Sequence, residues 1–187
     1  HVECYAIADD GFEFFGGTVN TKYLVSAFND DDAFDTDQGY RGKNQFWFAI
    51  QENVKRDNGG EWNGEPSNIA VSNAPYANFQ VYNATWIGAG AGVATNSNNG
   101  LFIREYSAPR VYNSVLTDFN NNSGTIACRL DANSGKMLTN GLLDLRENIF
   151  HGFTTASNSF SALLFNDLTR SNTTVNPLLT SISRATN

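Results

Sequence analysis

The sequence predicts an all-β solenoid, and three observations carry this prediction. Residues Asp9–Glu13 match Asp31–Asp35 at an offset of 22 residues, and the match continues to Ala27 and Ala49. A fixed repeat of about 20–50 residues is typical of folds in which each unit buries its apolar face against the next. Short apolar runs between Gly, Asn and Asp dominate the chain, and helical periodicity is scarce. Together these features predict a parallel β-helix.

The apolar runs predict short strands along the whole chain. Most of the runs end at Gly, Asn or Asp, which are residues that favour turns. Parallel strands stacked in this way lie about 4.8 Å apart. The predicted strands are Gly11–Phe15, Tyr23–Phe28, Phe46–Gln51, Ile69–Val71, Phe79–Tyr82, Thr85–Ile87, Leu101–Arg104, Val111–Tyr112, Val115–Leu116, Thr125–Leu130, Leu142–Leu145, Ile149–Phe150 and Ser161–Phe165.

Two later repeats predict that the coils lengthen toward the C-terminus. Residues 81–84 resemble residues 111–114 at an offset of 30 residues. Residues 115–119 resemble residues 149–153 at an offset of 34. A period that grows from 22 to 34 fits a β-helix whose turns carry insertions, and it fits poorly with a propeller or a leucine-rich repeat.

Polar, Gly-rich segments mark where the insertions are expected. The predicted loops are Glu52–Ser67 and Gly88–Asn99, and Leu130–Gly141 is predicted to hold a helical turn. Asn83 and Asn113 follow matched strands, so we expect them at a turn or in a ladder of asparagines.

The chain is long enough for one domain with a real core. It has 187 residues, of which 41% are apolar and 13% aromatic. We therefore expect a single β-helix domain over residues 1–187. His1–Cys4 reads as the middle of a strand, and Asn176–Arg184 reads as a segment laid across the last coil. Neither end is an obvious cap, which predicts a piece of a longer protein.

The charge balance excludes one large class of partner. A net charge of −7 and a pI of about 4.7 argue against nucleic acid, because phosphate requires a basic footprint. No apolar run approaches the roughly 20 residues that a transmembrane helix needs. The two cysteines, Cys4 and Cys128, are expected to be buried free thiols, since a disulfide between distant coils requires the chain to double back.

Several segments resemble a group of secreted bacterial right-handed parallel β-helix proteins. They are Asp9–Asn20, Asp30–Asp35, Gly39–Gly42, Val111–Ser114 and Asn176–Leu179. The resemblance spans most of the chain and implies right-handed coils and secretion. It implies no particular activity, because the group is largely uncharacterised. Polysaccharide lyases share this fold more distantly.

The repeat also stacks acidic residues on neighbouring coils. An offset of 22 places Asp10 beside Asp32 and Glu13 beside Asp35. Carboxylates at this spacing repel one another, so one of them takes a raised pKa unless a cation lies between them. Ca²⁺ binds about six to eight oxygen atoms from flexible loops and suits this arrangement. The alternative is a solvated acidic turn held by local hydrogen bonds. The candidate calcium ligands are Asp10, Glu13, Asp31, Asp32, Asp35 and Asp37.

Four other residues are candidates for contacting a glycan. We expect Arg41 to pair with an aspartate of the acidic segment. In a lyase, Arg41 would instead neutralise a uronate carboxylate, with Lys43 or Tyr40 as the base. Trp62 lies in a polar segment beside Glu61, so we expect it to be exposed and to stack on a sugar.

These observations favour a secreted or cell-surface module that is structural or adhesive and has no catalysis of its own. Its expected partners are polysaccharide or neighbouring protein subunits, with calcium as a stabiliser. The alternative is a polysaccharide lyase or glycoside hydrolase of β-helix fold that acts on an acidic glycan.

Overall fold

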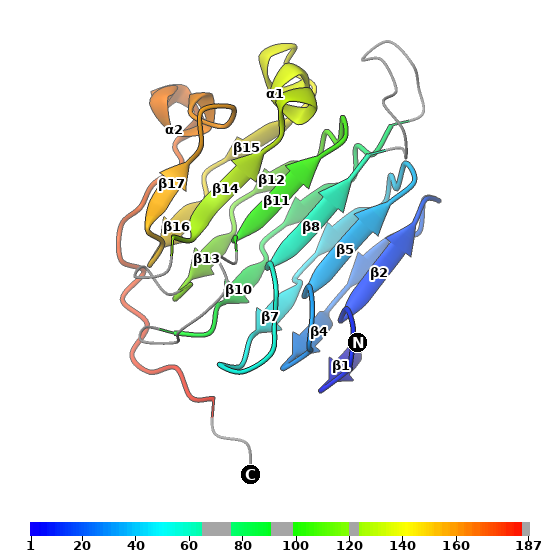
Figure 1. Ribbon diagram of the computed structural model, residues 1–187, viewed down its shortest axis with the longest axis vertical. Coiled ribbons are helices and arrows are strands. Elements are labelled where there is room, and N and C mark those ends of the chain that lie inside the picture. Colours follow the sequence, from blue (N-terminus) through cyan, green and yellow to red (C-terminus); the bar gives the residue numbers. More distant parts are fainter. Residues whose placement is uncertain (65–75, 91–98, 120–123, 185–187) are drawn as a thin grey trace.

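The computed structural model describes residues 1–64, 76–90, 99–119 and 124–184. Within these ranges the named strands form three sheets, here called A, B and C, and every recorded pairing is parallel (Figure 1). The chain visits A, B and C in turn and then returns to A one coil further on. This is the parallel β-helix that the repeat predicts.

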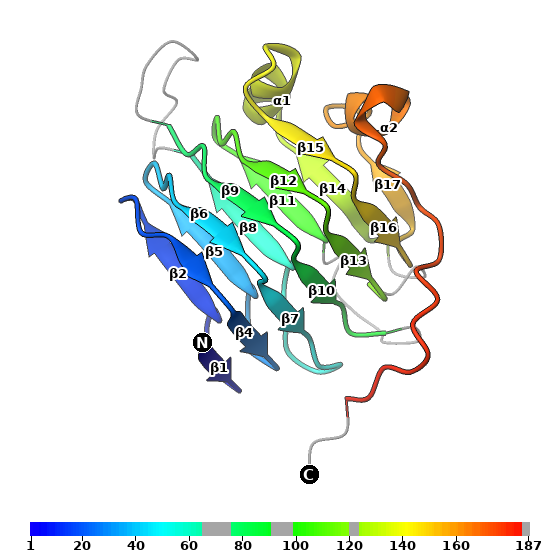
Figure 2. The same ribbon diagram turned by 180° about the vertical axis from the view of Figure 1, so that it is seen from behind.

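Each sheet runs the length of the solenoid. Sheet A contains β1 (Val2–Tyr5), β4 (Leu24–Ala27), β7 (Phe48–Ile50), β10 (Thr85–Ile87), β13 (Val115–Thr117) and β16 (Ile149–His151). Sheet B contains β2 (Phe12–Phe15), β5 (Phe34–Asp37), β8 (Gly60–Asn63), β11 (Leu101–Arg104), β14 (Ile126–Leu130) and β17 (Thr155–Ser157). Sheet C contains β3 (Thr21–Lys22), β6 (Lys43–Gln45), β9 (Gln80–Tyr82), β12 (Arg110–Tyr112) and β15 (Asp144–Arg146), and Figure 2 shows its strands from behind.

The predicted offset of 22 is the register of β2 on β5 in sheet B, where Glu13 pairs with Asp35, and of β1 on β4 in sheet A. The pairing of β4 with β7 in sheet A departs from it by one residue, because Ala27 pairs with Ile50 and not with Ala49. The extra residue lies in the turn between β5 and β6, since sheet C already has the larger offset there. The predicted pairing of Ala27 with Ala49 is therefore wrong by one position.

The later offsets are confirmed, and so is the role of the asparagines. β9 pairs with β12 at an offset of 30, and β13 pairs with β16 at an offset of 34. Asn83 and Asn113 have left-handed φ angles of 55° and 52°. The Nδ2 atom of Asn113 donates to Oδ1 of Asn83 at 2.6 Å, so the two side chains form one step of a ladder.

Several predicted elements need correction. Strand β8 lies inside the segment predicted as an inserted loop, and Ser161–Phe165 is not a strand because α2 (Leu163–Asn166) occupies it. The predicted strand Ile69–Val71 lies outside the described residues. The strand expected at His1–Cys4 is confirmed by β1, but the apolar runs do not mark the short strands β3, β5, β6, β8 and β17. Strands of two to four residues with polar outward positions carry little apolar signal.

Aromatic side chains fill the interior of the N-terminal half. Trp47, Trp62 and Trp86 are each at most 1% exposed. The rings of Phe34 and Trp47 stack with centroids 4.3 Å apart, and Phe79 meets Trp62 edge-on at 4.9 Å. Large planar side chains on successive coils bury a broad apolar area, which stabilises the stack of coils.

The helices lie in the last two coils, where the chain leaves sheet B. The helix α1 (Ala132–Thr139) falls within the predicted helical segment and is capped by Asp131, whose carboxylate accepts from the Ser134 backbone N–H. The short α2 and the 3₁₀ helix η1 (Leu168–Arg170) follow the last coil (Figure 1). No helix in the described ranges is long and apolar enough to span a membrane.

The C-terminal segment reaches further than predicted. The Arg184 guanidinium donates to the carbonyls of Gln51 and Gly88 and pairs with Asp118. The segment therefore runs back along the turns between sheets A and B, and it does not stop at the last coil. Both cysteines are free thiols, with Cys128 buried and Cys4 partly exposed, so the expected burial of Cys4 is only partial.

Candidate functional site

The carboxylates of the first coils gather where sheet A turns into sheet B. We call this region the acidic turn and define it as Asp9, Asp10, Glu13, Asp31, Asp32, Asp35 and Asp57. The register of β2 on β5 brings Glu13 beside Asp35, as predicted. Asp10 and Asp32 occupy equivalent places in the connections that lead into these two strands.

A ladder of hydrogen bonds runs through the acidic turn from coil to coil. Asp10 Oδ1 accepts from the Asp32 backbone N–H at 3.0 Å. Asp32 Oδ1 accepts from the backbone N–H of Asn58 at 2.6 Å and from its Nδ2 at 3.0 Å. Asn58 Oδ1 in turn accepts from the N–H of Asn99 at 3.0 Å and from its Nδ2 at 2.8 Å. Each side chain thus satisfies a backbone donor of the next coil, and the ladder holds the turn together.

Three groups of carboxylates within the described residues are close enough to share a cation. In each group, one oxygen atom from every member lies within 4.8 Å of the others. The groups are Asp10, Glu13 and Asp35; Asp9, Asp10 and Asp31; and Asp31, Asp32 and Asp57. Because all the donors are oxygen atoms, the arrangement suits a hard divalent cation such as Ca²⁺.

Burial makes these carboxyl groups difficult to ionise. Asp32 is 5% exposed, and its burial, followed by the nearby charges of Asp57 and Glu61, raises its pKa to about 9. Burial and the charge of Asp10 raise the pKa of Asp35 to about 8. The pKa of Asp10 rises to about 7, chiefly through burial. At neutral pH the acidic turn therefore holds protons or requires a neutralising cation.

The structure changes the predicted ligand set in two places. Asp37 joins none of the carboxylate groups, and its Oδ1 accepts from the backbone N–H of Gln38. Asp57, which lies outside the predicted set, joins Asp31 and Asp32. Asp57 lies 26 residues after Asp31, in a coil lengthened by four residues, so the 22-residue repeat does not mark it.

The prediction that Trp62 is exposed is wrong. Its side chain is 0% exposed, and its indole N–H donates to the Phe34 carbonyl at 3.0 Å. Side chains alternate along a strand, so on β8 the outward position belongs to Glu61 and the inward one to Trp62. The polar neighbours of Trp62 marked the outer face of a strand and not a loop. Trp62 therefore offers no sugar platform.

The structure argues against Tyr40 as the base of a lyase and shows the surroundings of Arg41 and Lys43. Tyr40 is buried, its hydroxyl donates to the Val19 carbonyl at 2.8 Å, and burial raises its pKa to about 12. A phenol with such a pKa is a poor base at neutral pH. Arg41 is exposed and forms no ion pair within the described part of the chain, so the expected pairing with an aspartate is not present. Lys43 lines a groove on sheet C.

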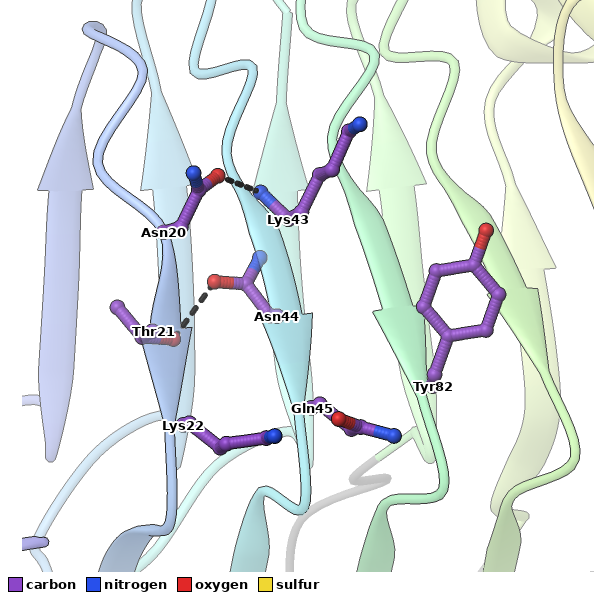
Figure 3. A pocket seen from close by; sticks show the side chains of 7 residues that line it. All are labelled: Asn20, Thr21, Lys22, Lys43, Asn44, Gln45 and Tyr82. Carbon is purple, nitrogen blue, oxygen red and sulfur yellow. Dashed lines mark hydrogen bonds between the residues drawn. The ribbon is translucent and has the colours of Figure 1, made fainter.

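That groove is the second candidate site, and sequence reasoning missed it. It has a volume of about 430 Å³ and lies across β3, β6 and the end of β9 (Figure 3). Two internal hydrogen bonds order it: Asn20 Oδ1 accepts from the Lys43 N–H, and Thr21 Oγ1 donates to Asn44 Oδ1. We call it the sheet C groove, and it is lined by Asn20, Thr21, Lys22, Lys43, Asn44, Gln45 and Tyr82.

The three parallel sheets, with a ladder at their turns, define the class as right-handed parallel β-helix proteins. A family model described as "Pectate-lyase like beta helix domain" matches residues 1–183, so the chain belongs to this family. Comparisons with curated proteins and with solved structures each found no match. The family assignment confirms the predicted fold and leaves the ligand and the activity to be proposed.

Proposed function

We propose that this chain is a secreted or cell-surface β-helix module with a structural and adhesive role, stabilised by calcium. The single observation that carries the calcium part is the crowding of Asp10, Glu13 and Asp35, whose oxygen atoms lie within 4.8 Å of one another. The resemblance to secreted β-helix proteins supports the location outside the cell. Polysaccharide and neighbouring protein subunits are the proposed partners.

Calcium would act by joining coils. Glu13 lies on β2 in the first coil and Asp35 on β5 in the second, so one ion between them would link two coils directly. It would also remove the repulsion that arises when buried carboxyl groups ionise. The backbone carbonyls of the turns and water would complete the oxygen shell that Ca²⁺ requires.

Strand edges and apolar side chains exposed in the first described coil support the adhesive part. β1, β2 and β3 each lie at the end of their sheet and pair on one side only in the described structure. Large apolar side chains are exposed there: Val2, Tyr5 and Phe15 are each more than 50% exposed. Unpaired strand edges beside apolar side chains accept another strand or another coil, from whichever chain supplies it.

A thermal melt tests the calcium proposal. With Ca²⁺ at about 100 times its Kd, binding to the folded state alone adds about 2.7 kcal/mol, which raises the Tm by roughly 5–10 °C. We expect this increase relative to EDTA in the wild-type chain, and we expect it to be absent in the double variant Glu13→Gln/Asp35→Asn.

The matched control is Asp37→Asn, which changes an acidic residue two positions away on the same strand but outside every carboxylate group. It should keep the calcium-dependent increase in Tm. No increase in the wild-type chain, or an equal loss in Asp37→Asn and in the double variant, contradicts a calcium site at Glu13 and Asp35.

A further inference from the structure

The outer face of sheet C presents two rows of polar side chains. The register places Lys22, Gln45, Tyr82, Tyr112 and Arg146 in one row across five coils. The second row contains Lys43, Gln80, Arg110 and Asp144. The alternate positions Asn44, Val81, Val111 and Leu145 are buried, so both rows face outward. Neighbouring members of a row are one strand spacing apart, about 4.8 Å.

These rows carry positive charge that the rest of the fold does not neutralise. Asp144 pairs with Arg146 at 2.5 Å and also with Arg170, so the carboxylate in the second row is already engaged. Lys22, Lys43 and Arg110 form no ion pair in the described part of the chain. Seven of the 19 acidic residues of the chain belong to the acidic turn and not to sheet C. The basic rows of sheet C and the carboxyl groups of the acidic turn therefore lie in separate regions of the fold.

Aromatic side chains stand in the first row, between Lys22 and Arg146. The rings of Tyr82 and Tyr112 sit one coil apart, with centroids separated by 5.4 Å and planes inclined by 32°. Lys22 Nζ lies 5.6 Å from the ring centroids of both Tyr23 and Phe46 at the rim. Figure 3 shows Lys22, Gln45 and Tyr82 side by side on neighbouring strands. A row of cation, amide and aromatic groups matches a polymer that carries spaced anions, hydroxyl groups and apolar C–H faces.

We propose that the sheet C face binds an anionic polysaccharide whose chain runs along the helix axis. Its sulfate or carboxylate groups contact Lys22, Lys43 and Arg110, its hydroxyl groups bond to Gln45, and its sugar faces stack on Tyr82. This rests on the glycan-binding part of the proposed function and names the surface and the ligand charge. A glycan fits better than nucleic acid, because a phosphate chain requires a denser basic footprint than three cations spread over several coils.

Binding to three dextrans with the same backbone tests this proposal. Dextran sulfate and carboxymethyl-dextran should bind the full chain by calorimetry, and unmodified dextran should bind at least about tenfold more weakly. The relative affinity of the two charged dextrans shows which anion the face prefers. The double variant Lys22→Gln/Lys43→Gln should weaken binding of the charged dextrans by about tenfold or more. Tyr82→Leu should also weaken it, because the stacking ring is lost.

The control variant Lys55→Gln/Lys136→Gln removes the same two charges away from sheet C and should bind like wild type. Equal loss in both double variants, or equal affinity for single-stranded DNA and dextran sulfate, would mean non-specific charge attraction and overturn the proposal. Binding of unmodified dextran alone overturns the anionic preference but leaves glycan binding intact. If none of the three dextrans binds, both the anionic preference and glycan binding are overturned. The thermal melt with Ca²⁺ tests the calcium site separately. Far-ultraviolet circular dichroism checks that each variant is folded.

Discussion

Asp32 shows how a buried carboxyl group serves in place of an amide. It occupies the same step of the ladder as Asn58 one coil later, and each accepts two hydrogen bonds at Oδ1 from the following residue of the ladder. An amide has a second atom that donates, whereas an ionised carboxylate only accepts. A protonated Asp32 restores that donor, which agrees with its raised pKa of about 9.

Asp32→Asn is therefore expected to stabilise the protein at pH 8 in EDTA. Because the folded state holds a proton that the unfolded state releases above about pH 4, stability falls between that pH and the folded pKa of about 9. The slope is at most about 1.4 kcal/mol per pH unit for one group. Urea unfolding from pH 5 to pH 9 should show a shallower fall in Asp32→Asn than in wild type. Glu3→Gln, on the exposed face of β1, should leave the slope unchanged.

At the scale of elements, the turn from sheet C to sheet A repeats with one residue per coil. Tyr23, Phe46, Asn83, Asn113 and Glu147 each have a φ between 52° and 59° and stand directly before a strand of sheet A or one residue from it. A residue with this left-handed backbone conformation costs free energy, and the cost is lowest for glycine and asparagine. Each coil therefore turns sharply at a single residue, and the left-handed backbone of that residue costs conformational free energy.

Substitutions at Asn113 measure the free-energy cost of this left-handed turn. Asn113→Val places a β-branched side chain at a φ of 52° and should destabilise the fold by about 1–2 kcal/mol, read from the midpoint of urea unfolding. Asn113→Gly loses the same hydrogen bond to Asn83 without the steric conflict, so the difference between the two variants isolates the backbone effect. Equal unfolding midpoints for the two variants would show that the side-chain bond, and not the turn geometry, governs this position.

At the scale of the whole molecule, burial depends on whether a strand has neighbours on both sides within the described structure. Cys4 lies on β1, the outermost strand of sheet A, and is partly exposed. Cys128 lies on β14 between β11 and β17 and is 0% exposed. Burial raises the pKa of both thiols, and the effect is larger for Cys128. Access to Cys128 requires separating coils, whereas access to Cys4 does not.

A thiol reagent at pH 8 should therefore modify one cysteine in the folded chain. Cys4 should react directly, and Cys128 should react only as fast as the coils unfold, because the thiolate is the reactive form and it must reach solvent. Cys4→Ser should abolish the fast phase and leave the slow one. Two fast phases in the wild-type chain would mean that the coils around β14 open without global unfolding.

The sequence by itself determined the repeat, and with it the solenoid and the pairing of Glu13 with Asp35. Those features are local, because a fixed period and turn residues such as Asn113 act within one coil. Only the tertiary structure decided that Trp62 faces inward, since the inner face of a short strand depends on the coils above and below it. Only the tertiary structure brings Lys22, Gln45 and Tyr82 together, because their spacings of 23 and 37 residues match none of the sequence repeats. Loop insertions change the spacing in sequence, while hydrogen bonding between coils keeps the strands aligned in space.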